Sequence, residues 1–318
     1  MTELAGTIIE GAEPADRGLV GIADPAIDEN RTEIINGALR DRGEYGAILG
    51  LLFAFVSIEI LKSPLVRGKL SLSSLRRIFS AFDKNSDKAI LDLWSSLEKN
   101  VRRALEKTLL AQNEAMRNQL LGEMSPERRK QLVEKALQRW RNTAFPKKTG
   151  VKPSTRLDAY ERMLRKKLAR ETTVDATRKG VEGINKSVKQ AFIGKMPGRT
   201  PVIGGSTYKQ MYRLGFSEQA RMSQQIAADY ARDVGFKFLR WTLHPMHPWY
   251  GGKEICEVLA SQVHGDTVAM LNRMGVDPAR FNLEGVYPIG QYPDYPHPFC
   301  MCSPQPVFIQ GHTKLKFR

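Results

Sequence analysis

The residue types that could do chemistry are concentrated near the C-terminal end of the sequence. All three cysteines and all five histidines of the 318-residue chain lie between residues 244 and 312. Thiolate sulfur and imidazole nitrogen are preferred protein ligands of Zn²⁺, and a structural zinc site takes four of them in a tetrahedron. The pattern therefore predicts a zinc site. Its candidate ligands are Cys256, Cys300, Cys302, His297 and His247.

The spacing leaves other roles open for these residues. A single residue separates Cys300 from Cys302, whereas paired zinc cysteines usually have about two to four residues between them. Alternate residues of a strand point the same way, so both thiols could still be ligands. The cysteines could instead be small buried residues, form a disulfide outside the cell, or act in a Cys/His nucleophilic pair. The acids that could orient such a pair are Glu254, Glu257 and Asp266.

Composition and length limit the classes to which the protein can belong. Hydrophobic residues make up 42% of the chain and charged residues 26%, which is ordinary for a globular protein. At roughly 150 residues a domain, the length predicts two domains. No apolar run reaches the roughly 18–20 residues of a membrane span, and the N-terminus lacks a secretory pattern. We therefore expect a protein that folds in a reducing cytoplasm without stable membrane insertion.

Charge is distributed unevenly along the chain. The net charge is +15, which predicts attraction to polyanions, although a solvated, charged helical face is the alternative interpretation. Residues 1–44 are acidic, with ten Asp and Glu against four Arg, whereas residues 126–170 hold fifteen Lys and Arg against four acids. The candidate DNA or phosphate contacts are Arg128, Arg129, Lys130, Lys147, Lys148, Lys152, Arg165, Lys166 and Lys167.

The N-terminal part of the chain predicts an arm followed by helices. Residues 1–44 lack sustained periodicity and predict a flexible acidic arm. Residues 45–62 are the most apolar stretch and predict a buried helix or one docked on another subunit, with a membrane-active segment as the alternative. Residues 45–195 as a whole predict a helical, basic region. Apolar residues recur at helical spacing at Leu97, Val101, Leu105, Leu109, Met116 and Leu120.

Local signals place further element boundaries. Ser125 before Pro126 predicts a helix start, and that helix would carry Leu132, Ala136 and Trp140 on one side. Residues 196–205 predict a Pro/Gly hinge, followed by a C-terminal domain over 206–318. There a helix capped by Ser217 should end before Gly235, with a strand over 236–243. Prolines between 287 and 298 predict a covering loop.

The fold class expected from these elements is α+β. We expect a mostly α-helical N-terminal body and a small C-terminal α+β domain rich in proline loops. The domain order would be an arm (1–44), a helical region (45–195), a hinge (196–205) and the Cys/His domain (206–318).

The residue order in the C-terminal domain is similar to a known family. It resembles the C-terminal module of tailed-phage minor head proteins, the Mu F-like head morphogenesis family. The resemblance covers about residues 241–302, and the preceding helix fits the family's layout. The matching residues are Trp241, His247-Pro248, Cys256-Glu257, Gly285-Val286-Tyr287-Pro288 and Pro296-His297-Pro298-Phe299-Cys300-Met301-Cys302.

This resemblance implies a structural role rather than an enzymatic one. It implies a virion protein of the phage head, near the portal, that aids procapsid assembly and contacts packaged DNA during packaging or ejection. The implied partners are the portal and major capsid proteins and double-stranded DNA bound without sequence specificity, with the host cytoplasm as the site of assembly. One alternative is a phage enzyme with an ADP-ribosyltransferase-like or nuclease-like C-terminal domain. Another is a plain nucleic-acid-binding module, although its usual motifs are lacking.

Overall fold

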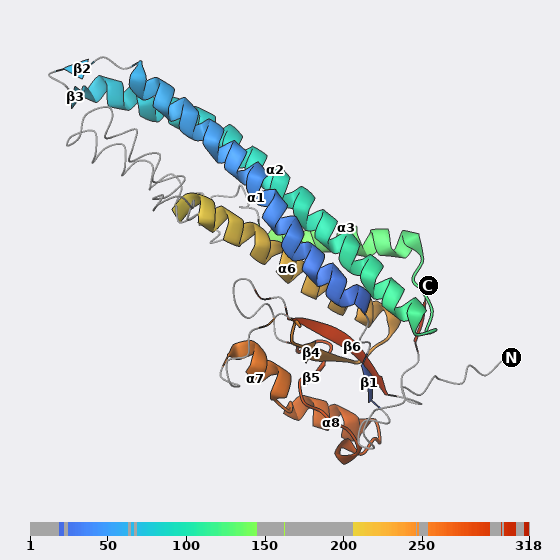
Figure 1. Cartoon of the computed structure of the whole chain (residues 1–318). Coiled ribbons are helices and arrows are strands. Elements are labelled where there is room, and N and C mark those ends of the chain that lie inside the picture. Colours follow the sequence, from blue (N-terminus) through green and yellow to red (C-terminus); the bar gives the residue numbers. More distant parts are fainter. Residues whose placement is uncertain are drawn as a thin grey trace. The chain divides into compact units, whose positions relative to one another are not determined.

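The computed structural model shows a mostly helical chain with a small antiparallel sheet formed largely by C-terminal strands, which confirms the α+β fold class (Figure 1). The structure describes residues 19–21, 25–62, 65–66, 69–144, 162, 206–245, 247, 254–292, 300, 302–309 and 315–317. The chain divides into two compact units. Unit 1 takes Met1–Ile35, Arg102–Ala136 and Ser217–Arg318, and unit 2 takes Asn36–Val101 and Leu137–Phe216. Each unit therefore combines segments that are distant in the sequence, rather than following consecutive domains.

Helix α1 runs over Pro25–Leu61 and includes much of the segment expected to be a flexible arm. The arm prediction is wrong for residues 25–44, which are helical, and for strand β1 at Leu19–Gly21. Residues 1–18 lie outside the described part of the chain. The apolar stretch 45–62 is the later part of α1 and not a separate helix. No helix among the described residues combines the length and apolar character needed to span a membrane.

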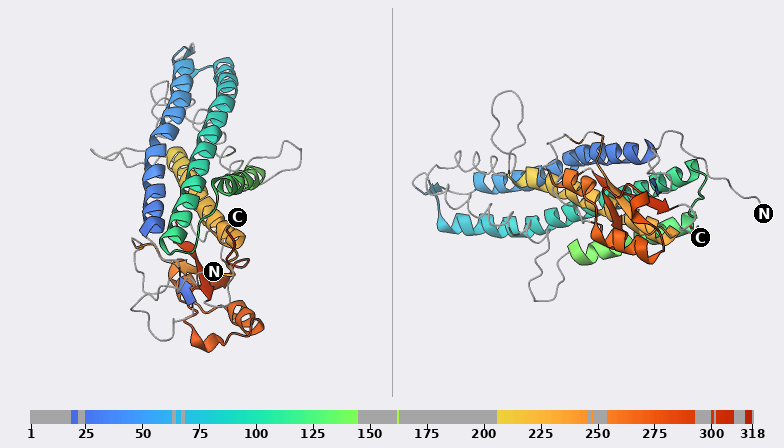
Figure 2. Two further views of the ribbon diagram at one scale, coloured as in Figure 1. Left: turned by 90° about the vertical axis from the view of Figure 1, so that its right-hand side faces the viewer. Right: turned by 90° about the horizontal axis from the view of Figure 1, so that it is seen from below.

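Unit 2 contains the later part of α1 and the first part of helix α2, Leu72–Asn118. These two helical segments lie side by side (Figure 2), and strands β2 (Leu65–Val66) and β3 (Lys69–Leu70) pair between them. Buried Tyr45 accepts a hydrogen bond from the Asn100 amide over 3.1 Å. Helix α1 exposes Leu51, Phe55 and Ile58, at i, i+4 and i+7, so these described side chains of the predicted apolar helix are not buried.

The apolar stripe predicted along α2 is largely confirmed. Leu97, Val101, Leu105, Leu109 and Met116 are all buried. Leu120 is not part of the stripe, because the helix ends at Asn118 and the Leu120 side chain is 71% exposed.

The end of α2 has the geometry of a Schellman motif. The Leu121 N–H donates to the Met116 carbonyl, and the Leu120 N–H donates to the Arg117 carbonyl. Leu120 takes the left-handed position of this motif with φ 56°, where glycine is the usual residue.

Helices α3 and α6 begin at different kinds of boundary. Helix α3, Pro126–Ala144, starts where predicted, with the Ser125 hydroxyl accepting from the Arg128 N–H over 3.2 Å. Helix α6 runs over Ser206–Val234, so Ser217 lies inside it and does not cap its start. Its end before Gly235, at φ 106°, is confirmed. The predicted hinge at 196–205 lies outside the described residues.

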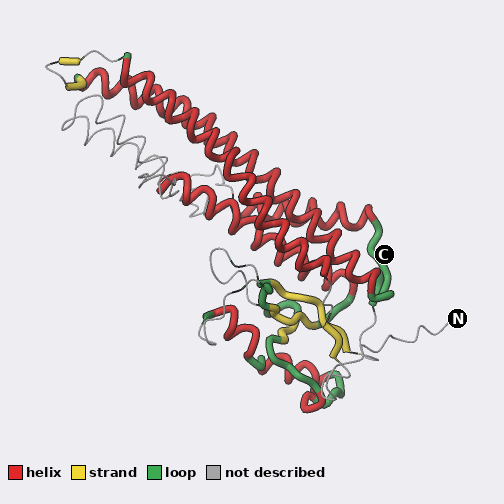
Figure 3. Tube along the Cα trace, viewed as in Figure 1, coloured by secondary structure: helices red, strands yellow, loops and turns green. Residues whose placement is uncertain are grey.

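Unit 1 contains a four-stranded antiparallel sheet with strand order β1-β6-β4-β5 (Figure 3). Strand β4 (Phe238–Thr242) confirms the predicted strand and pairs with β5 (Val286–Pro288) and β6 (Ser303–Ile309). Short helices α7 (Ile255–Ser261) and α8 (Gly265–Arg273) and a 3₁₀ turn η2 (Pro278–Arg280) connect β4 to β5.

Two apolar clusters are built on this sheet. One contains Phe238, Val286 and Val307 with Leu271 of α8. The other contains Trp241 and Tyr287 with all three cysteines. Val286 and Tyr287 are neighbours in β5 and belong to different clusters, because successive strand side chains point to opposite faces. The sheet therefore has a core on one side and the cysteine-containing cluster on the other.

Candidate metal centre

Three residues predicted as metal ligands lie together in unit 1. The ligand atoms of His247, Cys256 and Cys302 all lie within 4.8 Å of one another. Cys256 and Cys302 are fully buried, as is Cys300, and none of the three forms a disulfide. Zn–S bonds of about 2.3 Å place two sulfurs of a tetrahedron roughly 3.8 Å apart. This donor set and its spacing are compatible with a zinc ion, so the residues fit the metal that the sequence predicted.

Cys300 lies beside this group but is not one of the three residues whose ligand atoms are all within 4.8 Å of one another. Its Sγ lies 3.4 Å from the Cys256 Sγ, which is much longer than a disulfide bond of about 2.05 Å. We refer to His247, Cys256, Cys300 and Cys302 together as the Cys/His cluster. The remaining predicted ligand, His297, lies outside the described residues, as does most of the proline-rich track around it.

The members of the Cys/His cluster come from separate parts of the fold. His247 follows β4, in a turn closed by its N–H donating to the His244 carbonyl over 2.8 Å. Cys256 is the second residue of α7, and Cys300 and Cys302 immediately precede β6. The β4–β6 pairing brings the start of β6 beside the end of β4, with Thr242 opposite Ser303. The pairing register of the sheet therefore places Cys300 and Cys302 close to the turn that contains His247.

Glu254 connects two of the candidate ligands. One of its carboxylate oxygens lies 3.3 Å from His247 Nε2 and also accepts from the Cys256 N–H over 2.7 Å. Glu254 is the N-cap of α7, and Glu257 completes a capping box by accepting from the Glu254 N–H. With Nε2 directed at the carboxylate, Nδ1 is the ring nitrogen left to coordinate a metal. Carboxylates commonly orient metal-binding histidines in this way.

Two helices hold the backbone around the cysteine pair. Gln224 of α6 donates from Nε2 to the Cys302 carbonyl over 2.6 Å. Arg31 of α1 donates to the Ser303 carbonyl over 3.2 Å and to the Ser303 hydroxyl, and it pairs with Asp28. Arg31 is 4% exposed, although the sequence placed it in a flexible arm. No local sequence signal identifies the bonds that Arg31 and Gln224 make near the cysteine pair, because Ser303 and Cys302 are more than 70 residues away from them.

The thiols affect one another's protonation. Hydrogen bonds from Cys256 and then Cys300 lower the pKa of Cys302 by stabilising its thiolate. Hydrogen bonding with Cys300 and Cys302, together with burial, raises the pKa of Cys256. For Cys300, a bond with Cys256 lowers the pKa, but the bond with Cys302 and burial outweigh it and the net change is upward. Cys302 is thus the favoured position for the first thiolate, and thiolate is the form that binds metal.

Packing fixes the surroundings of the cluster. Gly285 has φ +68°, and a Cβ there would lie 2.8 Å from the Ala260 carbonyl oxygen and 3.1 Å from that of Trp241. Its own carbonyl accepts from the Trp241 N–H over 2.7 Å. The Tyr287 hydroxyl donates to the Leu259 carbonyl over 2.9 Å. The Gly-Val-Tyr-Pro segment therefore ties β4 to α7 at the edge of the Cys/His cluster.

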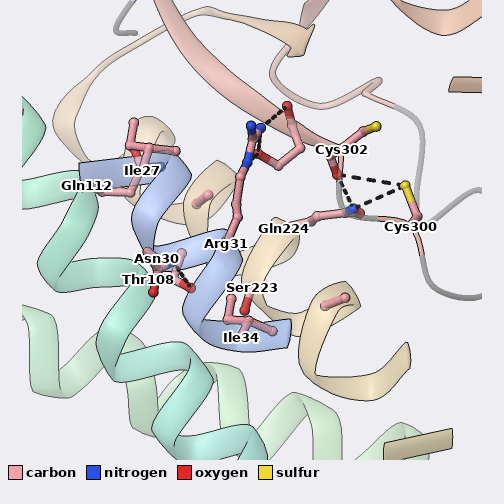
Figure 4. Close-up of a pocket in the computed structure, with 13 residues that line it drawn as sticks. Ile27, Asn30, Arg31, Ile34, Thr108, Gln112, Ser223, Gln224, Cys300 and Cys302 are labelled. Carbon is pink, nitrogen blue, oxygen red and sulfur yellow. Dashed lines mark hydrogen bonds between the residues drawn. The ribbon is translucent and has the colours of Figure 1, made fainter. Parts of the chain in front are cut away.

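A small chamber adjoins the cysteine pair on its helical side (Figure 4). Its walls come from α1, α2 and α6 and from Cys300, Cys302 and Ser303, all within unit 1. The chamber has a volume of about 30 Å³. Typical small-molecule sites measure about 300–1,000 Å³, so this chamber is too small for a cofactor or substrate of ordinary size.

The predicted basic contacts are only partly described. Arg128 forms an ion pair with Asp233, and Arg129 donates to the Met124 carbonyl over 2.8 Å, so both guanidinium groups make bonds within the protein. Lys130 is exposed. The other six predicted contacts, Lys147, Lys148, Lys152, Arg165, Lys166 and Lys167, lie outside the described residues.

Comparisons with protein-family models, curated proteins and solved structures give no match.

Proposed function

We propose that this chain is a structural protein of a tailed-phage head, a minor head protein that associates with the portal and the capsid interior. The supporting observation is that residues carrying the family resemblance converge in space. Trp241, Cys256, Tyr287, Cys300 and Cys302 come from widely separated positions and form one buried cluster. A pattern of this kind serves packing and cross-linking, since its members lie in a core and not around a substrate-sized opening.

We further propose that the Cys/His cluster binds one Zn²⁺ in a structural role. His247, Cys256 and Cys302 would supply three ligands, and Cys300, whose Sγ lies 3.4 Å from the Cys256 Sγ, is a candidate for the fourth. When bound, the metal supplies a cross-link whose binding free energy adds to folding. This chain's own residues position the ligands: Glu254 orients the imidazole, α7 presents Cys256, and β6 presents Cys302.

The enzyme alternative has less support. A catalytic zinc keeps an open coordination position facing a substrate site. Here the three thiols are buried, and the adjoining chamber of about 30 Å³ is too small for a nucleotide.

Two properties of the chain support a role in a larger assembly. Leu51, Phe55 and Ile58 form an exposed apolar stripe on α1, which suits contact with a portal or capsid protein. The net charge of +15 suits weak, sequence-independent contact with packaged DNA. The protein would then work in the virion head and assemble in the host cytoplasm.

Metal analysis of the purified full chain tests the zinc proposal. We expect about one zinc per chain, and loss of that zinc with a lower melting temperature in Cys302→Ser. Chelation should lower the melting temperature of the wild type and leave that of Cys302→Ser unchanged. A wild type purified with zinc in the medium that holds no metal would contradict the zinc proposal.

Sedimentation of the full chain with the portal protein of the same phage tests the head proposal separately. We expect a stable complex whose formation is weakened by replacing the apolar stripe on α1. Absence of any complex with either the portal or the major capsid protein would contradict the head proposal without bearing on zinc.

A further inference from the structure

The chamber beside the cysteine pair contains buried polar atoms that have no protein partner. These atoms are Asn30 Oδ1, Gln112 Oε1, Ser223 Oγ and Gln224 Oε1, and each belongs to a residue at least nine-tenths buried. All four residues line the chamber (Figure 4). A buried polar atom without a hydrogen bond is costly, so four around one small space call for a ligand that bonds to them.

Neighbouring hydrogen bonds decide which atoms face the chamber. Gln224 uses Nε2 to donate to the Cys302 carbonyl, which leaves Oε1 as the remaining group. The Thr108 hydroxyl donates to the Ala104 carbonyl, so it must accept from Asn30 Nδ2. Oδ1 of Asn30 is therefore the unpaired atom. At least two of the four atoms are acceptors only, and the ligand must donate hydrogen bonds to them.

We propose that this chamber is a hydration site that holds ordered water. A buried water needs two to four polar partners, and the chamber offers four polar atoms and about 30 Å³ of space. Water can donate to the amide oxygens and also accept from the Ser223 hydroxyl.

Other small ligands fit the lining less well. An anion would face amide oxygens that repel it. A cation would face the Arg31 guanidinium, and no carboxylate lines the chamber.

The waters would join three helices to the segment that immediately precedes β6. Asn30 comes from α1, Gln112 from α2, and Ser223 and Gln224 from α6, while Cys300 and Cys302 form the opposite wall. Direct bonds from Arg31 and Gln224 already hold the backbone at the start of β6, and the waters extend this network. The inference stands whether or not the Cys/His cluster binds zinc, because none of the four atoms is a proposed metal ligand.

Counting long-lived waters in the full chain tests the proposal. Oxygen-17 magnetic relaxation dispersion would compare the wild type with the double variant Gln112→Met/Ser223→Ala, which removes two of the four polar groups. We expect the double variant to lose at least one long-lived water. The matched control is Gln138→Met, at an exposed position of α3, which should lose none. An unchanged count in the folded double variant would overturn the proposal.

A second variant tests the proposal through stability, independently of the number of waters. Ala227 lines the chamber, and Ala227→Val adds two methyl groups there. In a hydrated chamber the methyl groups displace water and leave the chamber's polar oxygens without hydrogen bonds. This change should lower the melting temperature by about 3 °C or more. The decrease in melting temperature caused by Ala227→Val should be smaller in the Gln112→Met/Ser223→Ala background.

The other outcomes each overturn the proposal. A higher melting temperature in both backgrounds would indicate a dry cavity that gains from filling. An equal loss in both would indicate overpacking alone. If stability depends on which monovalent cation is present, and the double variant loses that dependence, the chamber holds a metal ion and not water.

Discussion

Replacing Gly285 by alanine should destabilise the C-terminal part of unit 1 more than the same change at Gly275 or Gly290. Gly285 lies in the turn before β5 with φ +68°, and an added Cβ would meet two backbone carbonyl oxygens, of Ala260 and Trp241, at 2.8 and 3.1 Å. Its N–H donates to the Gln262 carbonyl over 3.0 Å and its carbonyl accepts from the Trp241 N–H. The backbone therefore cannot shift without disturbing bonds on both sides.

The magnitude follows from two separable effects. The left-handed conformation costs alanine about 1 kcal/mol relative to glycine. Forcing a methyl group against fixed backbone adds about 1–3 kcal/mol, by analogy with overpacked cores. Gly285→Ala should therefore lower the free energy of unfolding by about 2–4 kcal/mol.

Two other glycines provide matched controls. Gly275 has φ +71°, but an added Cβ would have nothing within 4 Å, so Gly275→Ala measures the conformational effect alone, about 1 kcal/mol. Gly290 has open space around an added Cβ and no left-handed φ, so Gly290→Ala should change stability by no more than about 0.5 kcal/mol. Urea unfolding of the full chain, followed by tryptophan fluorescence, compares the three. A Gly285→Ala variant no less stable than Gly275→Ala would refute the steric reasoning.

Three further predictions concern the metal, the helix contact and the assembly. Glu254→Gln should lower zinc affinity by about 10–100-fold in a competition titration with a chromophoric chelator, because it weakens the orientation of His247 while an amide oxygen can still cap α7. Arg31→Met should lower the free energy of unfolding by about 2–3 kcal/mol in urea, since the buried guanidinium holds both Asp28 and Ser303. Phe55→Asp should leave the melting temperature nearly unchanged but weaken portal binding at least about tenfold in sedimentation, because it places a charge in the exposed stripe.

Each of these has a control at an exposed position. Glu284→Gln removes a carboxylate away from the Cys/His cluster and should leave zinc affinity unchanged. Lys107→Met breaks an exposed ion pair with Glu33 and should change stability by less than about 1 kcal/mol. Leu110→Asp alters another exposed leucine and should not affect portal binding. A variant that behaves like its control would contradict the corresponding role.

The sequence predicted the candidate metal ligands and the local helix boundaries better than the contacts between residues that are distant in the chain. The grouping of His247, Cys256 and Cys302 followed from ligand chemistry, and the start of α3 and the end of α6 followed from Ser125 and Gly235, whose signals are local. The helical state of residues 25–44 could not be predicted in this way. Its first turns depend on Arg31 bonding to Ser303, 272 positions along the chain.

Two local signals, at Ser217 and Leu120, gave wrong predictions. Ser217 is a good capping residue, yet α6 continues through it, and the side chains of Glu218 and Gln219, which follow it in the helix, are buried. Leu120 continues the spacing of an apolar stripe but lies beyond the helix end, in a left-handed position where glycine is expected.

The most direct test of the proposed function is to express the chain with the portal and major capsid proteins of the same phage. The assembled particles would be isolated and analysed by quantitative mass spectrometry and elemental analysis. Our account predicts a few copies of the chain in each particle and about one zinc for each copy. Particles that assemble normally and contain none of the chain would contradict it.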